Sequence, residues 1–160
     1  METRRGDRDS GIFAYEADGY VWLTDPDLSG HVVIPDGAKG IFEGGLSGCK
    51  GMTRITIPDS VRGIAGEGFR GCSALTEIYL PCHVTYLAES AFRGCTALTR
   101  VSIPASMTSI YDKVFADCPR LTSLCYRGTM AQWATMRRDP AWCAGSSLEI
   151  IHCTDGVIIL

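Results

Sequence analysis

The sequence has no apolar run that approaches the roughly 20 residues needed to cross a bilayer, so we expect no membrane insertion. It also has no surplus of basic residues, since the formal net charge is −3. A row of phosphates would find little counter-charge, and nucleic acid is therefore not predicted as a partner. Residues 1–10 (METRRGDRDS) carry charges where a secretion signal needs an apolar core. The chain as it stands is predicted to be cytoplasmic, whereas a fragment of a longer exported protein would lie at the cell surface or be secreted.

Motifs for catalysis and metal binding are missing as well. There is no glycine-rich phosphate loop, no serine nucleophile elbow and no HExxH sequence. Two histidines adjoin cysteines, in Cys82-His83 and His152-Cys153, but neither pair has the spacing of zinc ligands, and His31 lies far from both. We predict that the protein is not an enzyme and that it holds no metal and no cofactor. The alternative is a metal- or thiol-dependent enzyme that uses the cysteines outside the repeat described below, Cys82, Cys125, Cys143 and Cys153.

What the sequence does contain is a strict repeat of 23 residues. An aliphatic residue followed by proline recurs at this spacing, at Ile34-Pro35, Ile57-Pro58, Leu80-Pro81 and Ile103-Pro104. Four cysteines keep the same spacing: Cys49, Cys72, Cys95 and Cys118. A fixed period in the twenties predicts a solenoid, in which one small unit is stacked several times.

Each repeat predicts one short parallel strand. From Leu75 to Leu80 apolar and polar residues alternate, and Pro81 follows where the strand ends. Strands stacked about 4.8 Å apart would form a parallel sheet with the core on its inner face. The return side of each coil is too short for a long helix, so we expect turns and short helical bends there. Three phenylalanines at the repeat spacing should fill the coils: Phe69, Phe92 and Phe115.

The four cysteines on the repeat are expected to be buried and reduced, because every copy should occupy the same environment. The cysteines outside the repeat lack this explanation. A disulfide among Cys125, Cys143 and Cys153 therefore stays open.

The predicted organisation has four parts. Residues 1–10 form a disordered charged tail, residues 11–28 an N-terminal β-hairpin cap, residues 29–126 the solenoid, and residues 127–160 a C-terminal cap. In the last part, a capping box of Thr129 and Gln132 predicts a short helix from Ala131 to about Arg138. A hairpin that turns at Asp155-Gly156 follows it. The apolar last strand, with an open edge, predicts a homodimer through this C-terminal hairpin.

The repeat frame LxxIxIP...V..I....AF.GC resembles the BspA-like leucine-rich repeats. The resemblance is carried by ITIPDSVRGI, CSALTEIYLP, SAFRGCTALTRVSIPASMTSI and VFADCPRLTSL and covers about residues 29 to 126. Residues 126–133 and 151–156 are similar to the closing segment that often follows such repeats in bacterial proteins. The resemblance implies a cell-surface or secreted module for adhesion and protein binding.

The outward positions of the predicted strands give the candidate binding surface. They form one column of Arg54, Glu77, Arg100 and Ser123 and another of Thr56, Tyr79, Ser102 and Cys125. Arginine and tyrosine are enriched in the hot spots of protein interfaces. We therefore predict that a protein partner, of unknown identity, binds at Arg54, Thr56, Glu77, Tyr79, Arg100 and Ser102.

Three alternatives to this binding surface stay open. The charges of its first column alternate in sign and could serve only to pair neighbouring strands. A basic stripe on the return side, made of Arg62, Arg70 and Arg93, competes as a binding surface. A purely structural module that self-associates through its last strand is the third alternative.

Overall fold

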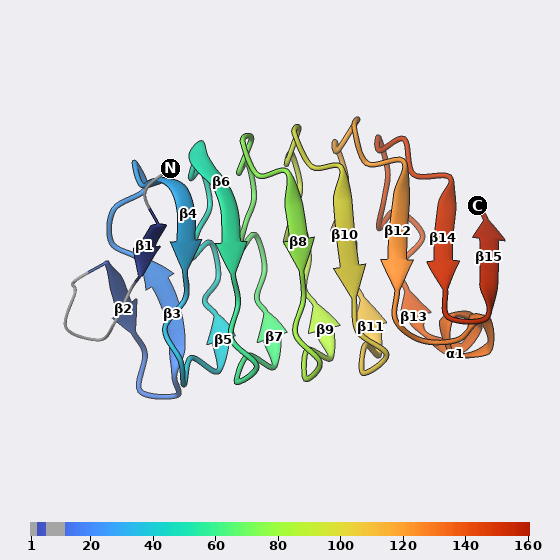
Figure 1. Ribbon diagram of the computed structural model, residues 1–160, viewed down its shortest axis with the longest axis horizontal. Coiled ribbons are helices and arrows are strands. Elements are labelled where there is room, and N and C mark those ends of the chain that lie inside the picture. Colours follow the sequence, from blue (N-terminus) through green and yellow to red (C-terminus); the bar gives the residue numbers. More distant parts are fainter. Residues whose placement is uncertain (1–2, 6–11) are drawn as a thin grey trace.

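The chain forms an elongated row of stacked coils that runs from β4 near one end to β15 at the other (Figure 1). This computed structural model describes residues 3–5 and 12–160. Each coil contributes one strand to the front of the row. The front strands are β4 (Ser29–Val33), β6 (Gly51–Thr56), β8 (Glu77–Tyr79), β10 (Arg100–Ile103), β12 (Ser123–Tyr126) and β14 (Ile150–Cys153). The solenoid predicted from the 23-residue period is confirmed.

The front strands are stacked in parallel, and β8, β10 and β12 keep the 23-residue register of the repeat. Arg100 is aligned with Glu77, and Ser102 with both Tyr79 and Cys125. The strands belong to two hydrogen-bonded sheets, one with the order β1-β4-β6 and one with the order β8-β10-β12-β14-β15. Because the register preserves the repeat spacing, side chains at one repeat position form a column across the front.

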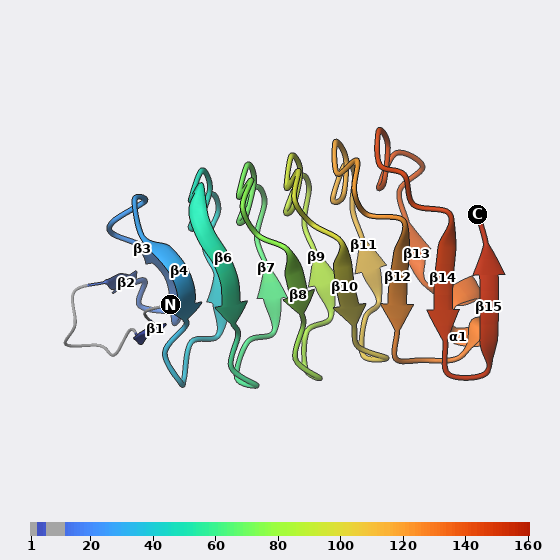
Figure 2. The same ribbon diagram turned by 45° about the horizontal axis from the view of Figure 1, so that its top comes forward.

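The return side has the predicted short turns, as at residues 66–71, and in addition carries short strands that were not predicted. Each coil contributes a two-residue strand there, β5 (Gly40–Ile41), β7 (Gly63–Ile64), β9 (Tyr86–Leu87), β11 (Ser109–Ile110) and β13 (Arg137–Arg138). These strands lie behind the front strands (Figure 2). The stacking explains these strands, because backbone groups find partners in a neighbouring coil, as Ala65 N–H does at Ile41 O of the preceding coil over 3.0 Å. A helical turn would have satisfied the same groups within one coil.

The core lies between the front and return strands, and its middle is a stack of aromatic rings. Phe92 packs face to face on Phe69, with ring centroids 4.9 Å apart, and on Phe115, at 5.5 Å. Trp142 packs against Phe115 in a T-shaped arrangement, with ring centroids 6.1 Å apart, and closes the stack toward the C-terminal end. All of these side chains are buried, as predicted for the phenylalanines.

A column of buried thiols runs beside the aromatic stack. The Sγ atoms of Cys72, Cys95 and Cys118 each donate to a backbone carbonyl of the preceding coil, at 3.1 to 3.3 Å. Burial raises the pKa of the Cys95 thiol, and it raises the pKa of Cys118 to about 11. These thiols therefore act as small, protonated core groups. All eight cysteines of the chain are free, so the disulfide left open among Cys125, Cys143 and Cys153 is not formed.

At the N-terminal end, β2 (Phe13–Tyr15) and β3 (Tyr20–Leu23) form an antiparallel hairpin where the sequence predicts a hairpin cap. The hairpin extends the return-side sheet, because β3 pairs in parallel with β5. The expectation of a disordered tail over residues 1–10 needs correction at β1 (Thr3–Arg5), which pairs in parallel with β4. Residues 1–2 and 6–11 lie outside the described residues.

At the C-terminal end, helix α1 (Met130–Thr135) begins at the predicted capping box, in which Thr129 and Gln132 each bond the other's backbone N–H. It ends earlier than predicted, because Arg137 and Arg138 join the return-side sheet as β13. The strands β14 and β15 (Gly156–Ile159) form an antiparallel hairpin, with α1 beside it (Figure 2). Within residues 3–5 and 12–160, no helix is long and apolar enough to span a bilayer.

Candidate functional site

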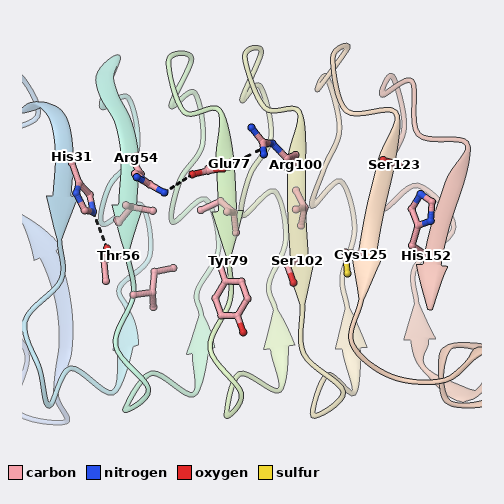
Figure 3. A pocket seen from close by; sticks show the side chains of 14 residues that line it. His31, Arg54, Thr56, Glu77, Tyr79, Arg100, Ser102, Ser123, Cys125 and His152 are labelled. Atoms are coloured by element: carbon pink, nitrogen blue, oxygen red, sulfur yellow. Dashed lines mark hydrogen bonds and ion pairs between the residues drawn. The ribbon is translucent and has the colours of Figure 1, made fainter. Parts of the chain in front are cut away.

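A groove of about 830 Å³ runs across the front of the solenoid, and we call it the front groove (Figure 3). Side chains of β4, β6, β8, β10, β12 and β14 line it. All six residues predicted to bind a partner lie along it: Arg54, Thr56, Glu77, Tyr79, Arg100 and Ser102. The repeat register brings them together, since they occupy two positions of three successive coils.

One side of the front groove carries a row of three charged side chains. Glu77 Oε1 lies 3.1 Å from Arg54 Nη2, and Glu77 Oε2 lies 3.9 Å from Arg100 Nε. The pairing across strands that the alternating charges predicted is therefore present. The two arginine side chains nevertheless remain 62% and 81% exposed, so the pairing leaves them accessible to a partner. Ion pairs this exposed contribute at most about 1 kcal/mol to stability.

The neighbouring column is dominated by Tyr79, a residue that is 61% exposed. The guanidinium of Arg127 lies over this ring, with Cζ 4.2 Å from the ring centroid. Arg127 also donates from Nη1 to the Tyr79 hydroxyl and from Nη2 to the Leu80 carbonyl. A cation held against one face of a phenol ring restricts its rotation. Tyr79 is thus an exposed aromatic side chain that Arg127 contacts both over its ring and at its hydroxyl.

Sequence reasoning missed Arg127, although the repeat contains a signal for it. Arg127 stands where earlier coils have the strand-ending prolines Pro58, Pro81 and Pro104. The long side chain reaches back two coils, from the end of β12 to the end of β8. A break in the proline pattern marks the position, but its reach depends on the stacked coils.

The front groove ends in two histidines that the sequence analysis did not join to the site. His31 lies at one end, where Nε2 is 2.8 Å from Thr56 Oγ1, and His152 lies at the other (Figure 3). His31 is 23 residues before Arg54, so the first column could have been extended to it. His152 is aligned with Cys125 but lies 27 residues after it, outside the repeat spacing.

The competing basic stripe on the return side is largely paired with carboxylates. Arg70 Nη1 lies 2.7 Å from Glu67 Oε1, and Arg93 Nε lies 3.0 Å from Asp117 Oδ2. Each arginine of these two pairs is matched by one acidic side chain, whereas the two arginines of the front groove share one. Counting Arg62, the stripe and the front groove each have one arginine more than the carboxylates that pair with them among the described residues.

The cysteines and histidines of the alternative enzyme hypothesis are spread over the molecule. Cys82 Sγ lies 3.6 Å from His83 Nδ1 on the surface. Cys125 and His152 line one end of the front groove, whereas Cys143 and Cys153 are half-buried near the C-terminal cap. Among the described residues, no group of three or more His, Cys, Asp or Glu side chains could hold a metal ion.

Short coils with in-register parallel strands on one face define the chain as a leucine-rich-repeat solenoid. The model of the BspA type leucine rich repeat region matches residues 28–135 in six copies. The match extends over more than half of the chain, and the chain therefore belongs to the BspA-type leucine-rich repeat family. No curated protein matched the sequence.

Several solved bacterial structures share the fold. A leucine-rich repeat protein of T. pallidum has a TM-score of 0.64 at 19% identity, with 76% of this chain and 71% of that chain covered. A leucine-rich cell surface protein of Faecalibacterium prausnitzii has a TM-score of 0.66 at 23% identity, with 82% and 41% covered. The pneumococcal vaccine antigen PcpA has a TM-score of 0.65 at 22% identity, with 79% and 31% covered. This chain thus spans less than half of the last two proteins.

Proposed function

We propose that the chain is a non-enzymatic module that binds a protein partner in its front groove. The observation that carries the proposal is the grouping of Arg54, Tyr79 and Arg100 on three neighbouring strands. Arginine and tyrosine are the side chains most often found at the energetic centre of protein interfaces. The backbone beneath them is rigid because each strand is stacked between two coils, so binding orders little of the chain.

The environment of Tyr79 supports the same proposal. An exposed aromatic ring loses rotamer freedom when a partner covers it, which weakens binding. Arg127 already holds this ring in place through its guanidinium and a hydrogen bond to the hydroxyl. Much of the ordering cost is therefore met before the partner arrives.

The solved relatives support an extracellular setting for this activity. One is described as a cell surface protein and another as a vaccine antigen. By analogy, we propose that the chain acts as an adhesin-type module of a surface protein. The competing setting is a stand-alone binder or inhibitor.

A capture experiment with two matched variants tests the proposal. The first variant combines Arg54→Glu, Tyr79→Ala and Arg100→Glu. The second makes the same kinds of change outside the front groove, at Arg62→Glu, Tyr111→Ala and Arg120→Glu. Both alter the net charge equally, and circular dichroism checks that both remain folded.

Wild type and both variants are used as bait for a cell lysate and for an extracellular matrix extract. We expect a partner that the wild type and the second variant capture and the first variant loses. The extract that supplies this partner identifies the setting. Equal capture by the first variant would contradict binding at the front groove.

A further inference from the structure

The front groove is more positive than the chain as a whole. Among the described residues that line it, Arg54 and Arg100 carry full positive charges, and Glu77 carries the one negative charge. Arg127, beside Tyr79, adds a third guanidinium. The entire chain has a formal net charge of −3. The front groove is thus a positive region on an acidic protein, which attracts and orients negatively charged partners.

Both groove arginines keep hydrogen-bond donors available. Each guanidinium has five N–H donors. Arg54 approaches Glu77 through Nη2, and Arg100 approaches it through Nε. The planar fork of a guanidinium pairs best with a carboxylate, which accepts two parallel hydrogen bonds. Glu77 is one such carboxylate, supplied by the chain itself.

The dimensions of the front groove suit an extended polypeptide. From β4 to β14 it crosses five interstrand spacings of about 4.8 Å, or about 24 Å, which an extended segment of about seven residues spans. The exposed ring of Tyr79 offers an apolar contact in the middle of this path. A surplus of one or two positive charges matches a few carboxylates better than a phosphate backbone.

We infer that the partner presents an extended acidic segment, whose carboxylates pair with Arg54 and Arg100 and compete there with Glu77. This inference rests on the proposed function and specifies the chemistry of the ligand. In the free protein Glu77 pairs with both guanidinium groups. In the complex its negative charge opposes the incoming carboxylates, so it lowers their affinity.

Synthetic peptides of the length of the front groove test this inference directly. The acidic probe has glutamate at alternate positions around a central phenylalanine, with serine elsewhere. Two matched probes replace every glutamate by glutamine or by lysine. Each is immobilised through a terminal biotin, and binding of the whole chain is measured by biolayer interferometry at low and high salt.

We expect the acidic probe to bind more tightly than the other two, and more weakly as salt rises. Two unit charges about 4 Å apart in water change a binding constant about fivefold. Arg54→Gln and Arg100→Gln should therefore each weaken binding of the acidic probe about fivefold, whereas Glu77→Gln should strengthen it by a similar factor. Arg62→Gln, outside the front groove, serves as the charge-matched control and should have little effect.

Equal binding of the glutamate and glutamine probes would overturn the inference, and so would weaker binding by Glu77→Gln. Different outcomes test the proposed function and the acidic ligand. If the captured protein is lost by the groove variant yet Glu77→Gln weakens its binding, the front groove is the binding site and its ligand is not acidic. If the acidic probe binds but no captured protein depends on the front groove, the ligand chemistry stands without the proposed partner class.

Discussion

Replacing Gly63 by alanine should destabilise the protein through a single contact on the return side. The register aligns Tyr20, Gly40, Gly63 and Tyr86 on four neighbouring strands. The two tyrosine rings lie over the two glycines, and their hydroxyl groups meet at 2.8 Å. A Cβ atom on Gly63 would lie 2.3 Å from Cε1 and Cζ of Tyr86. The absence of a side chain at Gly63 is what allows the ring to lie there.

The size of the effect follows from these distances. Ordinary contact begins at 3.4 Å, so the Tyr86 ring must retreat by about 1 Å from the present 2.3 Å. That movement breaks the bond to Tyr20, which is worth about 0.5 to 1.5 kcal/mol, and adds overpacking of about 1 to 3 kcal/mol. Gly63 does not have a left-handed backbone, so alanine also gains about 0.4 to 1 kcal/mol from the less flexible unfolded chain. We expect a net loss of about 2 kcal/mol.

The sign of the effect should reverse when the ring is removed. In a Tyr86→Ala background the clash is gone, so Gly63→Ala should stabilise by about 0.5 kcal/mol through the unfolded state alone. Urea unfolding, followed by circular dichroism, gives the free energies of unfolding of the wild type, both single variants and the double variant. These four values form a double-mutant cycle. The same cost in both backgrounds would refute the contact as the cause, and so would a neutral Gly63→Ala.

Three further predictions concern ionisation, thiol chemistry and assembly. Burial raises the pKa of Cys118 from 9.0 to about 11 and also raises the pKa of Tyr86, so the folded state favours the protonated forms of both groups. The free energy of unfolding should therefore be constant below pH 9 and fall as the pH rises toward 11. Urea unfolding midpoints measured across this pH range will check this. A flat profile would contradict this assignment. In the native protein a disulfide reagent should modify the exposed Cys82 and Cys125 first and the buried repeat cysteines only on unfolding, as peptide mapping can show; early modification of Cys95 would be inconsistent with the buried column. The homodimer through the C-terminal hairpin stays a prediction. Sedimentation equilibrium should show a dimer that Ile159→Lys abolishes, because Ile159 is 72% exposed on the last strand. A molecular mass that does not depend on protein concentration would exclude this dimer.

Much of the fold was predictable because the repeat specifies it in two ways. The spacing of Ile57-Pro58 and its copies fixes where each front strand ends, and in-register stacking then aligns equivalent residues. The short return strands were not predicted, since their pattern of one buried pair spaced by three, as in Val61 and Ile64, fits a bend equally well. Hydrogen bonds between coils favour the strand over the bend, and these bonds form only when the coils have stacked.

The candidate site was also only partly predictable from the repeat. The columns that contain Arg54 and Tyr79 follow from the period, because equivalent positions must share one face. Arg127 and His152 do not follow from it. Arg127 acts through a side chain that spans two coils, and His152 enters the front groove after a last coil of irregular length. A periodic pattern predicts which backbone positions align, and it says little about long side chains or irregular coils.

Hydroxyl-radical footprinting of the chain with its captured partner tests the central claim, that the front groove is the binding surface, most directly. Tyr79 and Tyr111 are both exposed in the free protein, Tyr79 in the front groove and Tyr111 on the return side. We expect the partner to lower oxidation of Tyr79 and to leave that of Tyr111 unchanged. Unchanged oxidation of Tyr79 in the saturated complex, with protection at Tyr111, would contradict it.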